Sequence, residues 1–108
     1  RGERLKRLHG AVSMADRRDR LGDYYTVHWD GPAGREGQEV RIVFDYRQAA
    51  TGAKVLSMTE ERPGAATGTV EFAVTGPAYQ KGGRVLAWRI RLYRDGELVD
   101  TKRSYLWN

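Results

Sequence analysis

The sequence predicts an all-β fold: an antiparallel β-sandwich of six to seven strands, preceded by a short N-terminal helix. Apolar and polar residues alternate with a period of two in successive segments from residue 23 onward, which is typical of half-buried strands. Turn residues separate these segments at intervals of roughly 8–15 residues, and no helical period lies between them. This spacing indicates a sandwich or a barrel.

The composition allows one domain with one core. The chain has 108 residues, of which 40% are hydrophobic. No apolar run approaches the roughly 18 residues of a membrane span. Cysteine is absent, which excludes disulfide scaffolds and thiolate metal sites. Because the chain begins at Arg1 and not at Met, we expect an excised piece that has lost a signal peptide or anchor, which favours an extracytoplasmic location.

The net charge of +5 is unevenly distributed along the chain. Residues 1–20 hold seven Arg or Lys against three Asp or Glu, whereas residues 21–108 hold twelve against eleven. The β-domain is therefore nearly neutral. A nucleic-acid-binding domain is more often basic over its own surface, so the charge argues against that class.

Residues 1–22 are interpreted as a basic N-terminal segment before a domain of residues 23–108. A narrow apolar stripe with helical spacing runs through it: Leu5, Leu8, Val12 and Ala15. Ser13 and Asp16 resemble a capping box, and Gly22 stands where a helix would end, so we expect a helix at residues 14–21. The segment is either a linker or an amphipathic helix that lies near a membrane or another domain.

Four strands are expected before the C-terminal hairpin, at residues 24–29, 40–47, 54–60 and 67–75. Three of them alternate cleanly, with these residues inward: Tyr25, Val27, Trp29, Val40, Ile42, Phe44, Tyr46, Val70, Phe72 and Val74. Turns are expected at residues 30–37 and 49–52. Residues 61–64 break the pattern because Pro63 lacks the N–H that a ladder needs. Residues 76–83 form a loop that carries Tyr79.

Residues 83–107 form a long hairpin closed by Asp95 and Gly96, a pair that accepts positive φ at both central positions of a type I′ turn. The residues expected inward on its first strand are Leu86, Trp88, Ile90 and Leu92. The register that follows from this turn places Leu92 opposite Val99, Arg91 opposite Asp100 and Arg89 opposite Lys102. A β-bulge beyond Asp100 would separate the last, like-charged pair and return Tyr105 and Trp107 to the face of Val99.

The arrangement of residues 23–107 resembles an immunoglobulin-like or fibronectin type III-like sandwich, of the kind found in bacterial domains without an assigned function. The resemblance implies that the hairpin is the last strand pair and that Trp88 is a central core aromatic. The cysteine pair of antibody domains is absent. The resemblance is one of architecture and does not carry a function.

The residues that carry catalytic chemistry are few. Only His9 and His28 could act as an imidazole base, and we expect His28 on the surface of a strand. Glu60 and Glu61 end a strand beside a turn, where solvated carboxylates are usual. The glycine-rich stretches lack phosphate-loop and dinucleotide-binding spacing, and residues 30–37 hold too few oxygen ligands for calcium. We therefore expect no enzyme, cofactor or metal site.

The candidate binding surface is the outer side of the hairpin. It combines basic residues with one aromatic: Arg89, Arg91, Tyr93, Arg94 and Lys102. Our first hypothesis is a non-enzymatic module for protein–protein interaction or scaffolding. The alternative is a barrel that binds single-stranded nucleic acid through Arg89, Arg91 and Tyr93 by stacking and charge neutralisation. A third hypothesis is carbohydrate binding by exposed aromatic residues: Tyr24, Tyr79 or Trp107.

Overall fold

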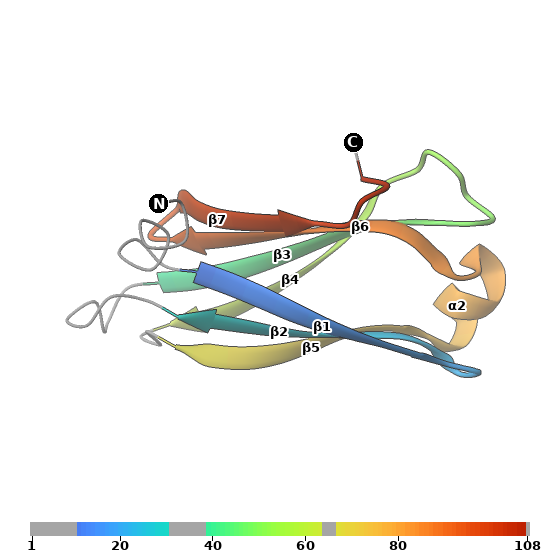
Figure 1. The fold of residues 1–108 in the computed structure, drawn as a ribbon, viewed down its shortest axis with the longest axis horizontal. Helices are drawn as coiled ribbons and strands as arrows, with labels where there is room; N and C mark the ends of the chain where they lie inside the picture. Colours follow the sequence, from blue (N-terminus) through green and yellow to red (C-terminus); the bar gives the residue numbers. More distant parts are fainter. Residues whose placement is uncertain (1–10, 31–38, 64–66, 108) are drawn as a thin grey trace.

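The computed structural model describes residues 11–30, 39–63 and 67–107. Seven strands and one short helix are seen in this part of the chain: β1 (Ala11–Asp19), β2 (Gly22–Asp30), β3 (Glu39–Gln48), β4 (Leu56–Pro63), β5 (Gly68–Thr75), α2 (Gly76–Gly82), β6 (Val85–Arg94) and β7 (Glu97–Arg103). The strands form two antiparallel sheets, ordered β1-β2-β5 and β4-β3-β6-β7. The sheets are stacked as two layers, with α2 at one end (Figure 1). The predicted all-β antiparallel sandwich is confirmed.

The core lies between the sheets and is built from the predicted inward residues of β2, β3 and β5, all of which are buried. Phe44 of β3 is fully buried at its centre, and its ring centroid lies 4.7 Å from that of Tyr25 and 5.4 Å from that of Phe72. Both of these neighbours belong to the opposite sheet. The strict alternation of apolar and polar residues identifies the buried residues correctly, because each of these strands has one face in the core.

The predicted helix at residues 14–21 is wrong. Residues 11–19 form β1, which pairs with β2 along its whole length, from Ala11 opposite Asp30 to Asp19 opposite Gly22. Only Val12 of this edge strand is fully buried, because the inward positions become charged after Met14. A strand with so short an apolar stretch shows little period-2 signal. Residues 1–10 lie outside the described residues.

Two other boundaries differ from the prediction. Strand β4 begins at Leu56 and continues to Pro63, past the expected break at Glu61. As an edge strand, β4 pairs only with β3, so a proline at its end costs no ladder hydrogen bond. The predicted loop at residues 76–83 contains α2. A proline in its first turn favours the start of the helix. The helix is capped by Gly83, whose N–H donates to the Tyr79 carbonyl at 2.8 Å. The predicted turn at residues 31–37 and Gly64 lie outside the described residues.

The hairpin turn is confirmed. Asp95 and Gly96 have φ values of 49° and 82°, as a type I′ turn requires. The predicted register holds only as far as Tyr93 opposite Leu98, because a shift between Leu92 and Tyr93 makes Val99 the extra residue.

This bulge lies earlier than predicted and changes which residues meet. Asp100 faces Leu92 on the inner side, so the predicted pair of Arg91 with Asp100 is wrong. Arg91 faces Thr101, and Arg89 faces Arg103 instead of Lys102. A second irregularity, between Arg47 and Gln48, makes Leu86 an extra residue on β6, and Leu86 is 39% exposed instead of inward.

The fully buried tryptophan is Trp29, which is 1% exposed. Its ring occupies the space beside Gly68, where a Cβ atom would come within 2.4 Å of the ring. A glycine is therefore required at the start of β5. Trp88, predicted as the central core aromatic, packs against the core but is only partly buried.

Two buried aspartates join the sheets directly. Asp23 of β2 accepts the Val85 N–H of β6 at 2.8 Å, and Asp100 of β7 accepts the Val12 N–H of β1 at 2.7 Å. Asp23 is 1% exposed and Asp100 6% exposed. The Val12 bond lies near the start of β1, and the Asp23 bond lies just after the turn that follows β1. Together they define how the two layers lie against each other.

No helix in the described part of the chain is long and apolar enough to cross a membrane.

The burial difference between the two tryptophans predicts different stability costs. Trp29→Ala should lower the free energy of unfolding by about 3–5 kcal/mol, because it empties a fully buried site. Trp88→Ala should cost clearly less, because part of its ring already contacts water. Urea denaturation followed by circular dichroism measures both. A larger loss for Trp88→Ala than for Trp29→Ala would contradict this description of the core.

Candidate functional site

The outer face of the four-stranded sheet carries a cluster of arginines that we call the arginine face: Arg41, Arg47, Arg89, Arg91 and Arg103. The first two lie on β3, the next two on β6 and the last on β7. Strand register brings them to one side, because residues opposite each other in a ladder share a face. Alternation along β3 and β6 then leaves the other face of these strands for the core.

A single buried carboxylate organises the centre of the arginine face. Asp45 is 1% exposed and faces Arg89 across the β3–β6 ladder. Arg89 donates to it from Nε at 3.0 Å and Nη2 at 2.9 Å, and Arg91 from Nε at 3.0 Å and Nη2 at 3.2 Å. Ser57 of β4 donates to the same carboxylate at 2.6 Å. Both guanidinium groups are thus held in fixed positions and keep one net positive charge between them and Asp45.

Both aromatic rings of this face are covered by guanidinium groups. The Arg41 Cζ lies 4.6 Å from the centroid of the Tyr93 ring, and the Tyr93 hydroxyl accepts a hydrogen bond from Arg91 Nη1 at 2.8 Å. Trp107 lies beneath Arg47 and Arg89, at 5.1 and 5.0 Å, and is 8% exposed. The predicted return of Tyr105 and Trp107 to the inner face of Val99 is wrong, because Trp107 lies on the outer face and Tyr105 is fully exposed.

The structure brings together three of the five predicted surface residues. Arg89, Arg91 and Tyr93 lie side by side on the outer face of β6. Arg94 does not join them, because the next residue along a strand points to the opposite face. It is 5% exposed and its Nη2 donates to the Asp30 carbonyl of the other sheet at 3.1 Å. Lys102, opposite Ile90, is on the inner side of the β7 edge because of the bulge.

Sequence reasoning missed Asp45 as the partner of the two arginines. Asp45 alternates with the apolar residues of β3, so it lies on the same side of the strand as Arg41 and Arg47, and a lone carboxylate between two basic residues is a signal that the sequence contains. What was lacking was the order of the strands, since only the β3–β6 pairing sets Asp45 opposite Arg89. The sequence predicts Asp100 as the partner of Arg91 because the register of a hairpin can be counted from its turn, whereas the register of strands that are distant in the sequence cannot.

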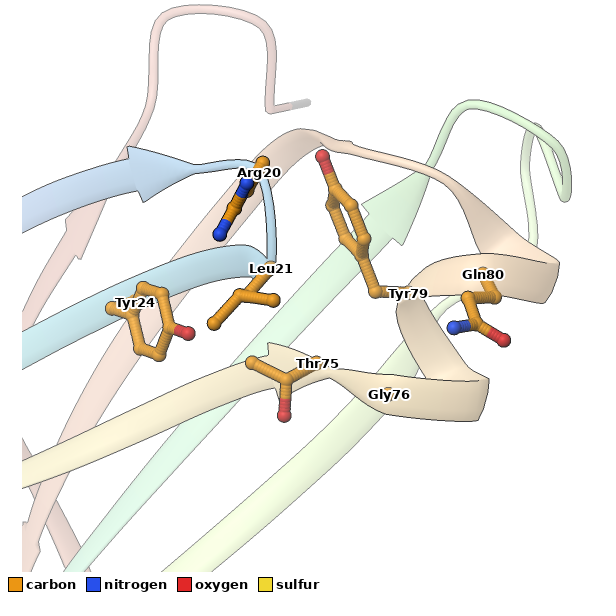
Figure 2. Close-up of a pocket in the computed structure, with 7 residues that line it drawn as sticks. All are labelled: Arg20, Leu21, Tyr24, Thr75, Gly76, Tyr79 and Gln80. Atoms are coloured by element: carbon orange, nitrogen blue, oxygen red, sulfur yellow. The ribbon is translucent and has the colours of Figure 1, made fainter.

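A second feature is an open hollow of about 400 Å³ at the α2 end of the sandwich, which we call the tyrosine hollow. Figure 2 shows its lining: Arg20, Leu21, Tyr24, Thr75, Gly76, Tyr79 and Gln80. Leu21 lies between the two tyrosines in this view and is 63% exposed. The hollow brings together Tyr24 and Tyr79, two of the three aromatic residues predicted for carbohydrate binding. The third, Trp107, lies on the arginine face.

A charged cluster beside this hollow has a structural role. Arg18 of β1 donates to Asp23 of the same sheet from Nε and to the Val85 carbonyl of the other sheet from Nη2 at 3.1 Å, and Asp23 accepts the Val85 N–H. The hydrogen bond to Asp23 raises the pKa of Arg18. Burial, assisted by the negative charge of Asp23, raises the pKa of Tyr25 well above its ordinary range, although Arg18 opposes the shift.

The remaining titratable candidates lie apart from one another. His28 is a surface strand residue, as predicted, with its Nδ1 3.1 Å from the Thr69 hydroxyl and its Nε2 3.5 Å from Asp30. Glu60 pairs with Arg62 at 2.6 Å, while Glu61 points to the other face of β4. Within the described ranges, no three His, Cys, Asp or Glu residues come close enough to hold a metal ion.

Comparison of the chain with protein-family models, curated proteins and solved structures finds no significant match. The geometry of the chain's own surfaces is therefore the basis for the function proposed below.

The network around Asp45 predicts a stability effect. Asp45→Ala should lower the free energy of unfolding by about 1–3 kcal/mol, because the hydrogen bonds from two arginines and Ser57 are lost while the guanidinium groups can still hydrate. Glu60→Ala is the matched control: it breaks an exposed pair and should cost less than about 1 kcal/mol. Equal costs for the two variants in urea denaturation would show that Asp45 does not hold the arginines.

The raised pKa of Tyr25 predicts a loss of stability in alkali. Above about pH 10 the tyrosine ionises in the unfolded chain but stays protonated in the folded one, so the free energy of unfolding falls as the pH rises. Tyr25→Phe should make this decline shallower above about pH 10. Tyr105→Phe, at a fully exposed position, should leave it unchanged. Urea titrations at several pH values test this, and parallel declines in all three proteins would refute it.

Proposed function

We propose that this domain is a non-enzymatic protein-binding module whose arginine face binds an acidic segment of a partner protein. The observation that carries the proposal is the pair Arg89 and Arg91, held by Asp45 at the centre of a sheet face with three further arginines around it. Pre-positioned arginines lose little side-chain entropy on binding, and arginine is enriched among the residues that dominate binding energy at protein interfaces.

The charge balance of this face favours an anionic partner. Asp45 neutralises one of the two guanidinium groups that it holds, and Arg41 faces Glu61 across the β3–β4 ladder. Arg47 donates to the Leu106 carbonyl, which carries no charge, and Arg103 has no carboxylate partner within the part of the chain that the structure describes. The surface is thus positive, and charge complementarity with an acidic segment would steer its association.

The same geometry favours protein over single-stranded nucleic acid. Nucleic-acid binding of the kind expected for Arg89, Arg91 and Tyr93 needs exposed ring faces on which successive bases stack. Here Arg41 covers the Tyr93 ring and two arginines cover Trp107, which is nearly buried. The arginines therefore offer charge and hydrogen bonds but no free stacking platform.

The strand arrangement supports the architectural part of the proposal. A three-stranded sheet β1-β2-β5 facing a four-stranded sheet β4-β3-β6-β7 is compatible with a fibronectin type III-like sandwich. We propose membership of this architectural class, with β6 and β7 as its last strand pair.

The test is fluorescence anisotropy with a labelled poly-glutamate peptide at low salt. The domain should bind the peptide, and binding should weaken as salt rises because exposed charges are screened. The double variant Arg89→Ala/Arg103→Ala should raise the Kd about tenfold, since each exposed pair contributes up to about 1 kcal/mol.

The matched control is Lys81→Ala/Arg84→Ala, which removes the same charge from exposed positions at the α2 end and should leave the Kd nearly unchanged. Equal losses in both double variants would mean that net charge alone drives binding. A labelled oligo-dT strand is measured in parallel. Tighter binding of this strand than of the peptide, lost in Arg89→Ala/Arg103→Ala, would replace the protein partner with nucleic acid.

A further inference from the structure

The tyrosine hollow is a second surface, separate from the arginine face. Its residues come from the β1–β2 turn, from β2 and from the junction of β5 with α2, whereas the arginine face belongs to the other sheet. A ligand in the hollow would leave the arginine face free.

One wall of the hollow is a rigid hairpin tip. Arg20 and Leu21 form the two-residue turn between β1 and β2, and the Leu21 N–H donates to the Asp19 carboxylate at 2.8 Å. The same carboxylate accepts Arg17 Nη1 at 2.7 Å, and the Arg17 guanidinium lies 3.9 Å from the centroid of the Tyr24 ring. This chain of contacts fixes the turn and one face of Tyr24 while Leu21 stays exposed.

The other wall is α2, which a buried amide holds in place. Gln48 of β3 is 2% exposed, and its Nε2 donates to the Ala78 carbonyl at 3.1 Å and to the Gly83 carbonyl at 2.8 Å. Gly82 packs against this amide so closely that a Cβ atom there would come within 2.3 Å of Gln48 Oε1. Helix α2 therefore cannot move without breaking the network, and the hollow exists before any ligand arrives.

The lining has the chemistry of a small amphipathic site. Tyrosine rings and Leu21 make most of it apolar, and the hydroxyl groups of Tyr24 and Tyr79 supply hydrogen-bonding groups (Figure 2). Arg20 is the one charged residue among the lining residues. A hollow of this size with an apolar lining and a few polar groups is typical of small-molecule sites.

We infer that the tyrosine hollow binds a sugar ring that bears a carboxylate, a uronic acid. The C–H groups of such a ring pack against the tyrosines, whose ring faces are electron-rich. Its hydroxyls pair with the hydroxyl groups of Tyr24 and Tyr79, and its carboxylate pairs with Arg20. A simple alkyl carboxylate would pair with Arg20 but would make no hydrogen bond to the tyrosine hydroxyls, so it should bind more weakly than the uronic acid.

The experiment is a nitrogen–proton correlation NMR titration of the labelled domain with three separate probes: glucuronate, glucose and hexanoate. Each is added to about 10 mM, because a site with one ion pair and few hydrogen bonds has a Kd near the millimolar range. Glucuronate should shift the backbone amides of Leu21, Gly76 and Gln80. Glucose should shift the same amides less.

Arg20→Gln tests the charge at an exposed turn position, and its spectrum shows directly whether the variant is folded. Glucuronate shifts in this variant should fall to the size of the glucose shifts, whereas Arg84→Ala should not change them. No shift at the hollow with glucuronate would overturn the inference. So would shifts with hexanoate that equal or exceed those with glucuronate, because the site would then recognise an apolar acid and not a sugar.

Discussion

The two sheets of this domain are held against each other by buried carboxylates that accept backbone N–H groups from the facing sheet. Apolar packing drives the sheets together but has no direction, so it does not by itself define how one layer lies on the other. Asp23 with Val85 and Asp100 with Val12 supply that direction. Each carboxylate is buried, and leaving either N–H unpaired would cost the desolvation energy of a buried polar group.

Both candidate sites depend on this alignment. Asp23 lies next to the β1–β2 turn, so its hydrogen bond to β6 places Arg20 and Leu21 beside α2. These two residues then form one wall of the open tyrosine hollow. On the four-stranded sheet a third buried aspartate, Asp45, faces outward, away from the core that Phe44 fills from the neighbouring position. Because that core keeps β3 and β6 in register, Asp45 meets Arg89 and Arg91 and the arginine face becomes rigid.

The errors of sequence reasoning arise where local pattern and tertiary context disagree. Val12 and Ala15 fit a helical stripe, but β1 is an edge strand whose inward positions run from Val12 to the charged Arg18, which pairs with Asp23 instead of entering a core. Arg94 is predicted on the outer surface together with the other basic residues, but the structure buries it. A hydrogen bond to the Asp30 carbonyl of the other sheet helps to offset the cost of that burial. In each case the partner comes from a distant part of the chain.

The sequence by itself determined the features that depend on residues close together along the chain. Alternation in β2, β3 and β5 selects which residues face the core, and Asp95-Gly96 selects a type I′ turn, because both depend on local backbone geometry. The tertiary structure alone decided which carboxylate meets which arginine and how deeply each of the inward-facing tryptophans, Trp29 and Trp88, is buried. These outcomes depend on strand order and on two β-bulges, and a bulge of one residue reverses the facing of everything beyond it.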